Sequence, residues 1–219
     1  MLNNQIIRSN RKTLSISINE NAELVVRAPN QMSAQKIQDF INEKESWIKR
    51  NQAVIKARHK NTIEDKNALL YLGTLFPIKK IDNDSKKITF NGKEFIANFE
   101  DKEKTNISLK TWYKNKFKEV AVPRLFYFAD KHNLQVNQVR IKEQRTLWGS
   151  CSSRNNINLN FLLIMAPLKV IDYVIIHELV HTIHKNHSVN FWNAVEAIMP
   201  NYKEAKLWLK ENGYKLRTL

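Results

Sequence analysis

Residues 167–185 decide the fold, and they read PLKVIDYVIIHELVHTIHK. Proline suits the first position of a helix, and the residues that follow Pro167 are apolar on nearly every side of a helix. A helix of that kind is stable only in the interior of a protein, so we expect a buried helix over this segment. The sequence HELVH at 177–181 places polar groups inside that buried helix.

The HExxH motif has the spacing of a metal site. His177 and His181 occupy positions i and i+4, which lie on one helix face, so both imidazoles can bind one cation. Glu178 is turned about a quarter-circle round the helix, where it can reach a metal-bound water without binding the metal. Such groups are costly to bury unless they are satisfied, and the alternative is a set of core histidines bonded to backbone carbonyls. The motif predicts one Zn²⁺ per chain, whose bound water loses its proton to Glu178.

A catalytic zinc site uses three protein ligands, and two histidines are candidates for the third. His184 lies on the same face as His181 but about 4.5 Å further along the axis, which is far from a metal centred between 177 and 181. His187 can fold back only if the helix ends near Lys185–Asn186. Its spacing equals that of the metzincin motif HExxHxxGxxH, although His184 occupies the glycine position. We favour His187 as the ligand, and expect His184 to line the cleft or orient a ligand.

The rest of the chain predicts an α+β fold, with a strand-rich N-terminal half and a helical C-terminal half around the HExxH helix. Strands are expected at 4–29, 69–81, 86–99, 139–142 and 156–160. The segment 86–99 should form a hairpin around Asn91-Gly92, and the sequence WGSCSSRN at 148–155 should form turns. Helices are expected at about 33–58, 107–133, 167–185, 188–198 and 201–212. Ser33 is the candidate N-cap of the first helix, and Phe126 is a core candidate of the second. Pro123 should kink or break the second of these helices. We place a strand-rich region at 1–105 and a catalytic region at 106–219, and the two can form one continuous domain.

Composition limits the class of protein. The 219 residues carry a formal net charge of +15 and one cysteine, Cys151, which excludes an internal disulfide and a Cys-cluster metal site. No apolar run reaches the roughly 18 residues of a membrane span, and the N-terminus lacks the apolar region of a secretory signal. We therefore expect a cytoplasmic protein without a membrane partner. The positive charge attracts anions, but no nucleic-acid-binding motif accompanies it.

Several motifs occur in the order of a known family. They are WGSCSS at 148–153, INLN at 157–160, DYVIIHELVH at 172–181, NHS at 186–188 and FW at 191–192. In these the chain resembles the YgjP-like metallopeptidases, which are relatives of the SprT-like zinc proteases. The resemblance implies a zincin-like catalytic region and a peptide or protein substrate. It also implies that His177, His181 and His187 are the metal ligands, and that Glu178 is the catalytic acid and base.

Three functions are open at this point. The first is a zinc metallopeptidase, in which Asn158 and Asn160 lie on a strand that can pair with the extended substrate. The second is a metal-dependent nucleotide pyrophosphatase; Arg145 lies in the most basic part of the chain and can bind an anionic substrate, although no P-loop is present. The third is a nucleic-acid-associated, SprT-like role. We prefer the metallopeptidase, because metal-activated water and a general base are the chemistry of the motif.

Overall fold

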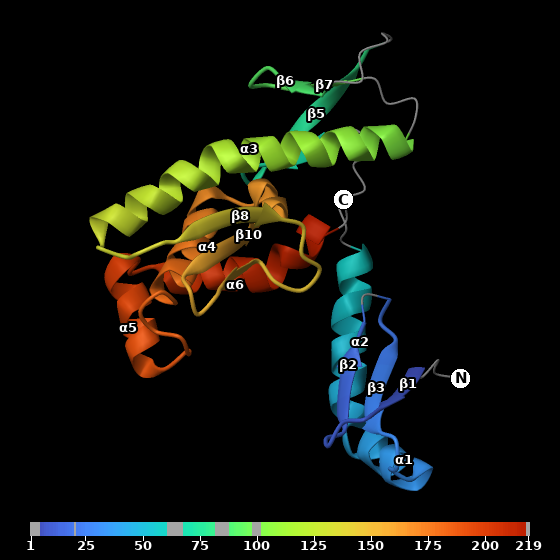
Figure 1. Cartoon of the computed structure of the whole chain (residues 1–219). Coiled ribbons are helices and arrows are strands. Elements are labelled where there is room, and N and C mark those ends of the chain that lie inside the picture. Colours follow the sequence, from blue (N-terminus) through green and yellow to red (C-terminus); the bar gives the residue numbers. More distant parts are fainter. Residues whose placement is uncertain (1–4, 20, 61–67, 82–87, 98–101, 218–219) are drawn as a thin grey trace. The chain divides into compact units, whose positions relative to one another are not determined.

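Helices and strands are mixed along the chain, which confirms the predicted α+β class (Figure 1). The computed structural model describes residues 5–19, 21–60, 68–81, 88–97 and 102–217. They belong to two compact units, Met1–Glu64 and Asp65–Leu219. No helix in the described part of the chain has the length and hydropathy to cross a membrane.

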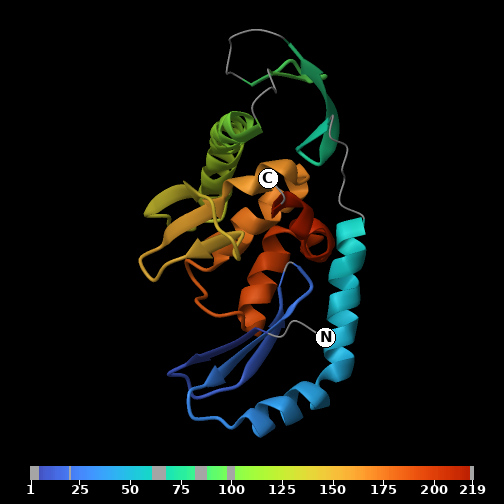
Figure 2. The ribbon, with the colours of Figure 1, turned by 90° about the vertical axis from the view of Figure 1, so that its right-hand side faces the viewer.

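The first unit is a three-stranded sheet with two helices. Strands β1 (Gln5–Ser9), β2 (Ser15–Ile18) and β3 (Leu24–Pro29) fall where the sequence predicts strands. Strand β3 is central, parallel to β1 and antiparallel to β2. Helix α1 (Ala34–Glu43) lies below the strands in Figure 2, and α2 (Glu45–Lys60) rises beside them.

The single helix predicted over 33–58 is divided in two at Lys44. Ser33 caps α1 as expected, its Oγ accepting a hydrogen bond from the Lys36 amide. The Lys44 amide bonds to the carbonyls of both Phe40 and Ile41, which tightens the last turn and ends α1. The break lets Ile48 of α2 join one apolar core with residues of α1 and β3. Burial of apolar area outweighs the few hydrogen bonds that a continuous helix would add.

The second unit begins with a four-stranded sheet of order β4-β5-β7-β6. Its strands are β4 (Ala68–Tyr71), β5 (Thr74–Lys80), β6 (Thr89–Phe90) and β7 (Phe95–Ala97). The strand predicted over 69–81 is a tight hairpin, since Leu72 and Gly73 both have positive φ (48° and 84°). The predicted hairpin at Asn91-Gly92 is confirmed by antiparallel pairing of β6 with β7, and its flanks at 82–87 and 98–101 lie outside the described residues.

Helix α3 (Lys102–Lys131) confirms the long predicted helix and continues through Pro123 without a break. Proline removes one backbone hydrogen bond, but Ala121 and Leu125 beside it are fully buried in the main core. That packing holds the helix together across the proline. Phe126, a predicted core residue, is instead 45% exposed.

A three-stranded sheet leads into the central helix. Strands β8 (Gln138–Lys142) and β10 (Asn156–Asn160) were predicted, whereas β9 (Gly149–Cys151) lies in a stretch expected to be turns. Strand β10 is central, parallel to β8 and antiparallel to β9. The 3₁₀ helix η1 (Phe161–Met165) connects β10 to the next helix.

Helix α4 (Leu168–Val180) is the buried HExxH helix, and it contacts α3, α5, α6, β9 and β10. It is followed by α5 (Val189–Ile198), α6 (Tyr202–Asn212) and the 3₁₀ helix η2 (Gly213–Arg217). The predicted helices at 188–198 and 201–212 are thus confirmed. Strands β4–β7, which were predicted to belong to the strand-rich region at 1–105, lie in the same compact unit as these helices.

A bidentate ion pair joins α3 to α4. The Arg124 guanidinium donates Nε to Asp172 Oδ1 at 2.5 Å and Nη2 to Oδ2 at 2.6 Å, and the Asp172 side chain is 15% exposed. We expect Asp172→Asn to lower the free energy of unfolding by about 1.5–3 kcal/mol, because it weakens two charge-assisted hydrogen bonds. Urea denaturation measures this. Lys116→Gln, which breaks the exposed pair with Glu119, is the control, and an equal loss in both variants would contradict a special role for the α3–α4 pair.

Candidate metal centre

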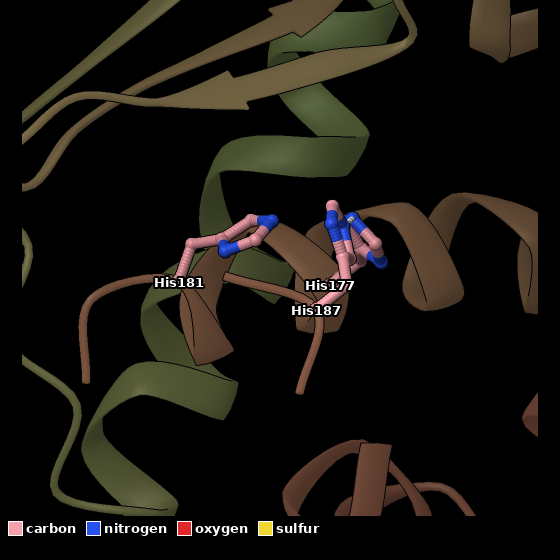
Figure 3. A group of neighbouring side chains, drawn as sticks. All are labelled: His177, His181 and His187. Atoms are coloured by element: carbon pink, nitrogen blue, oxygen red, sulfur yellow. Dashed lines mark hydrogen bonds between the residues drawn. The ribbon is translucent and has the colours of Figure 1, made fainter. Parts of the chain in front are cut away.

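Three histidines converge at the end of α4. His177 lies in its last turn, His181 is its C-cap residue, and His187 lies between α4 and α5. One ring nitrogen from each lies within 4.8 Å of the others, a group that can hold a metal ion. Figure 3 shows the His181 ring pointing toward the rings of His177 and His187. The structure therefore brings together the three histidines that the sequence predicts as ligands.

The chain can reverse between His181 and His187 because α4 is shorter than the predicted helix. The helix stops at Val180, not near Lys185, and the amides of Ile183 and His184 both bond to the Val180 carbonyl. Ser188 then caps α5, its Oγ accepting from the Phe191 amide. The turn after Val180 and the cap at Ser188 together bring His187 back to the His177 ring.

The hydrogen bonding of His181 orients its ring for a metal. Its Nδ1 lies 2.9 Å from the backbone carbonyl of His184. A carbonyl only accepts hydrogen bonds, so Nδ1 carries the hydrogen and Nε2 keeps its lone pair. The lone pair is then available to a cation, which is how metal-binding histidines are commonly held.

The rings of His177 and His187 face each other through their Nε2 atoms at 3.0 Å. Burial, then the neighbouring His181, His187 and Lys206, lower the pKa of His177 to about 3, so its ring is neutral at pH 7. Burial also lowers the pKa of His181. Neutral imidazoles are the form that binds metal, and the two Nε2 atoms, which share a hydrogen bond here, are close enough for one cation to bind both in its place. The donor set therefore fits a divalent metal ion.

Aromatic residues surround the three rings. The fully buried Phe191 has its ring centroid 4.9 Å from that of His177, 4.5 Å from His181 and 4.8 Å from His187. Trp192 stacks on His187 at 5.7 Å and on Tyr202 at 5.5 Å. The contact of Phe191 with all three rings was not predicted from the sequence. The position of Phe191, four residues after His187 at the start of α5, is the feature that could have indicated it.

Glu178 directly follows His177 on α4 and is not one of the three residues of the cluster. Its side chain is buried, 5% exposed, and packs against the backbone of Gly149 in β9. Burial raises the pKa of the Glu178 carboxyl to about 8. A positive charge bound nearby would lower this pKa again, so the carboxyl can exchange a proton near neutral pH.

Residues 12–212 match the YgjP-like metallopeptidase domain. The chain belongs to this family. Two solved structures are similar to parts of this YgjP-like chain, and both are metallopeptidase zymogens. Abylysin of Pyrococcus abyssi is 26% identical over 41% of this chain and 93% of its own, with a TM-score of 0.37. Jannalysin of Methanocaldococcus jannaschii is 22% identical over 44% and 95%, with a TM-score of 0.36. No curated protein matches the chain.

Membership of the YgjP-like family makes the chain a hydrolase of the metallopeptidase class. The match covers most of both compact units and includes the HExxH helix and His187. Nothing in the family match supports the nucleotide or nucleic-acid alternatives.

In this YgjP-like chain the side chains of Asn158 and Asn160 on β10 form hydrogen bonds within the sheet and to the segments next to it. Asn160 is fully buried; its Nδ2 donates to the carbonyls of Gln144 and Leu147, and its Oδ1 accepts from the Leu162 amide. Asn158 donates to Ser150 Oγ on β9 at 2.9 Å. Both edges of β10 are bonded to strands, so β10 offers no edge to an extended peptide.

The other two predicted substrate residues lie outside the histidine cluster. His184 accepts a hydrogen bond from His181 through its backbone carbonyl, but its ring is not among the three, and the role predicted for its side chain stays a prediction. Arg145 is exposed in the segment between β8 and β9. The strand that sequence reasoning missed, β9, lies at the edge of its sheet and contacts α4.

Proposed function

We propose that the chain is a zinc-dependent peptidase with one zinc ion held by His177, His181 and His187. Glu178 is its general base and acid. The observation that carries this proposal is the convergence of three histidine nitrogens within 4.8 Å beside a buried glutamate. Three protein ligands with an open fourth position are the pattern of catalytic zinc.

A bound zinc ion would supply a polarised water and a Lewis acid for the substrate carbonyl. The protein provides the remaining steps. Glu178 accepts a proton from the attacking water on a carboxylate oxygen and then donates it to the nitrogen of the leaving amine. The backbone carbonyl of His184 holds the His181 ring in one tautomer, and Phe191 excludes water from the inner side of the three rings.

A peptide or protein substrate would bind along β9. Within the described residues β9 is bonded only to β10, so its other edge can pair with an extended chain. Strand β9 also lies against Glu178, which brings a paired peptide close to the base. The substrate-pairing role that the sequence suggested for Asn158 and Asn160 thus passes to Gly149–Cys151. A cytoplasmic location remains part of the proposal.

The purified chain tests the proposal directly. We expect about one zinc per chain by elemental analysis, and hydrolysis of a quenched-fluorescent peptide library that stops with a chelator and returns with Zn²⁺. A nucleoside triphosphate tested side by side should not be hydrolysed. Absence of bound metal, with no change on adding Zn²⁺, would favour the core-histidine alternative and remove the enzyme assignment.

A further inference from the structure

Gly149 leaves no room for a side chain because Glu178 occupies the space. A Cβ built on Gly149 would lie 2.6 Å from both Cγ and Oε1 of Glu178, and 2.8 Å from Cδ. Non-bonded heavy atoms in a packed interior stay at about 3.5–4.0 Å. Any other residue at this position must therefore displace either Glu178 or the strand.

The backbone of Gly149 does not itself require glycine. It lies in β9, paired with Leu159 of β10 in a regular antiparallel register. Among the described glycines only Gly73 and Gly92 have positive φ, the conformation that favours glycine. The missing side chain, and not the backbone conformation, is thus what this position needs.

Glu178 has little freedom to move away from a new methyl group. Its neighbours one turn before it on α4 are also buried, Val174 at 4% exposed and Ile175 at 0%, and so is Thr182 in the turn after α4, at 8%. Helix α4 packs directly on β9 and β10. In a closely packed interior, such a clash shifts the side chains and backbone next to it.

We propose that Gly149 is the positioning residue for Glu178, and that its bare backbone forms the wall that holds the carboxylate beside the three histidines. The inference rests on the proposed role of Glu178 as the base. Strand β9 is also an edge strand of its sheet. A peptide paired with β9 and the base Glu178 would therefore both be positioned by the same strand. The glycine of the WGSC motif thereby acquires a role in aligning the reaction.

The test compares Gly149→Ala with the wild-type chain. Metal content should be unchanged, because the three atoms nearest to the added Cβ all belong to Glu178 and not to a histidine of the cluster. We expect kcat to fall by about 10²-fold, the scale of a misplacement of about 1 Å, while KM changes by only a few-fold. In the Glu178→Asp background, whose side chain is one methylene shorter, adding Gly149→Ala should lower kcat much less. A kcat close to wild type in Gly149→Ala would overturn the proposal.

Thermal unfolding distinguishes the specific contact of Gly149 with Glu178 from general packing of β9 on α4. Gly149→Ala should lower Tm by at least about 2 °C in the wild-type chain but not in the Glu178→Ala background, where the clashing side chain is removed. An equal fall in both backgrounds would contradict the proposal. This readout does not depend on activity. If Glu178→Gln kept full activity, the proposed base would fail, while the unfolding data would still decide whether Gly149 makes room for Glu178.

Discussion

Glu178→Gln is expected to keep the fold and the metal but to lose peptide hydrolysis by about 10²–10⁴-fold, the usual contribution of a general base. Glutamine has nearly the same shape as glutamate, so it fits the space against Gly149. It cannot accept a proton from water, which is the step assigned to Glu178. The measurement is kcat/KM on a cleaved member of the peptide library, with metal content and Tm determined on the same sample.

The matched control removes a carboxylate away from the cluster. Glu119 on α3 is exposed, and within the described residues its ion pair is with Lys116. Glu119→Gln changes the net charge by the same amount and should leave kcat/KM close to wild type. Hydrolysis at the wild-type rate by Glu178→Gln would exclude Glu178 as the base. Loss of metal in that variant would instead make Glu178 a ligand.

His187→Ala is expected to lose the metal. His187 provides one of only three nitrogens in the cluster, and its Nε2 lies 3.0 Å from that of His177. Loss of an outer partner of a metal ligand already lowers affinity by roughly 10–100-fold, so loss of a direct ligand should exceed that range. Competition with a chromophoric chelator gives the zinc affinity. Peptide hydrolysis should disappear with the metal.

His184→Ala distinguishes the two histidines that the spacing left open. His184 supports the cluster through its backbone carbonyl, which accepts from His181 Nδ1 and which alanine retains. The zinc affinity of this variant should therefore stay close to wild type. Equal zinc affinity in His184→Ala and His187→Ala would contradict the choice of His187. A greater loss in His184→Ala would assign the third position to His184.

Features set by neighbours in the sequence were predictable. The four-residue spacing of His177 and His181 places both on one helix face whatever surrounds the helix. The cap at Ser33 and the hairpin at Asn91-Gly92 depend on local hydrogen bonds and φ preferences, and both occur as predicted. The apolar sequence of α4 by itself predicted a buried helix, and nine of its thirteen residues are buried.

Features set by distant contacts were not predictable in the same way. Residues 149–151 look like a turn because Gly149 and Ser150 favour turns, yet β10 pairs with them as a strand. Helix α3 passes through Pro123 because buried neighbours stabilise it, and the predicted helix at 33–58 divides so that Ile48 can reach the core. In each case long-range burial outweighed a local preference.

The sequence by itself determined the α+β class, the buried HExxH helix and the residue types that can bind a metal, since these depend on spacing and composition. Only the tertiary structure decided how the third histidine approaches the other two, through a helix that ends at Val180 and a turn held by its carbonyl. It also decided that β9, not β10, is an edge strand of the sheet formed by the described residues and lies against Glu178. The physical reason is that strand pairing and close packing join residues far apart in the chain, and their free energy is not contained in any local pattern.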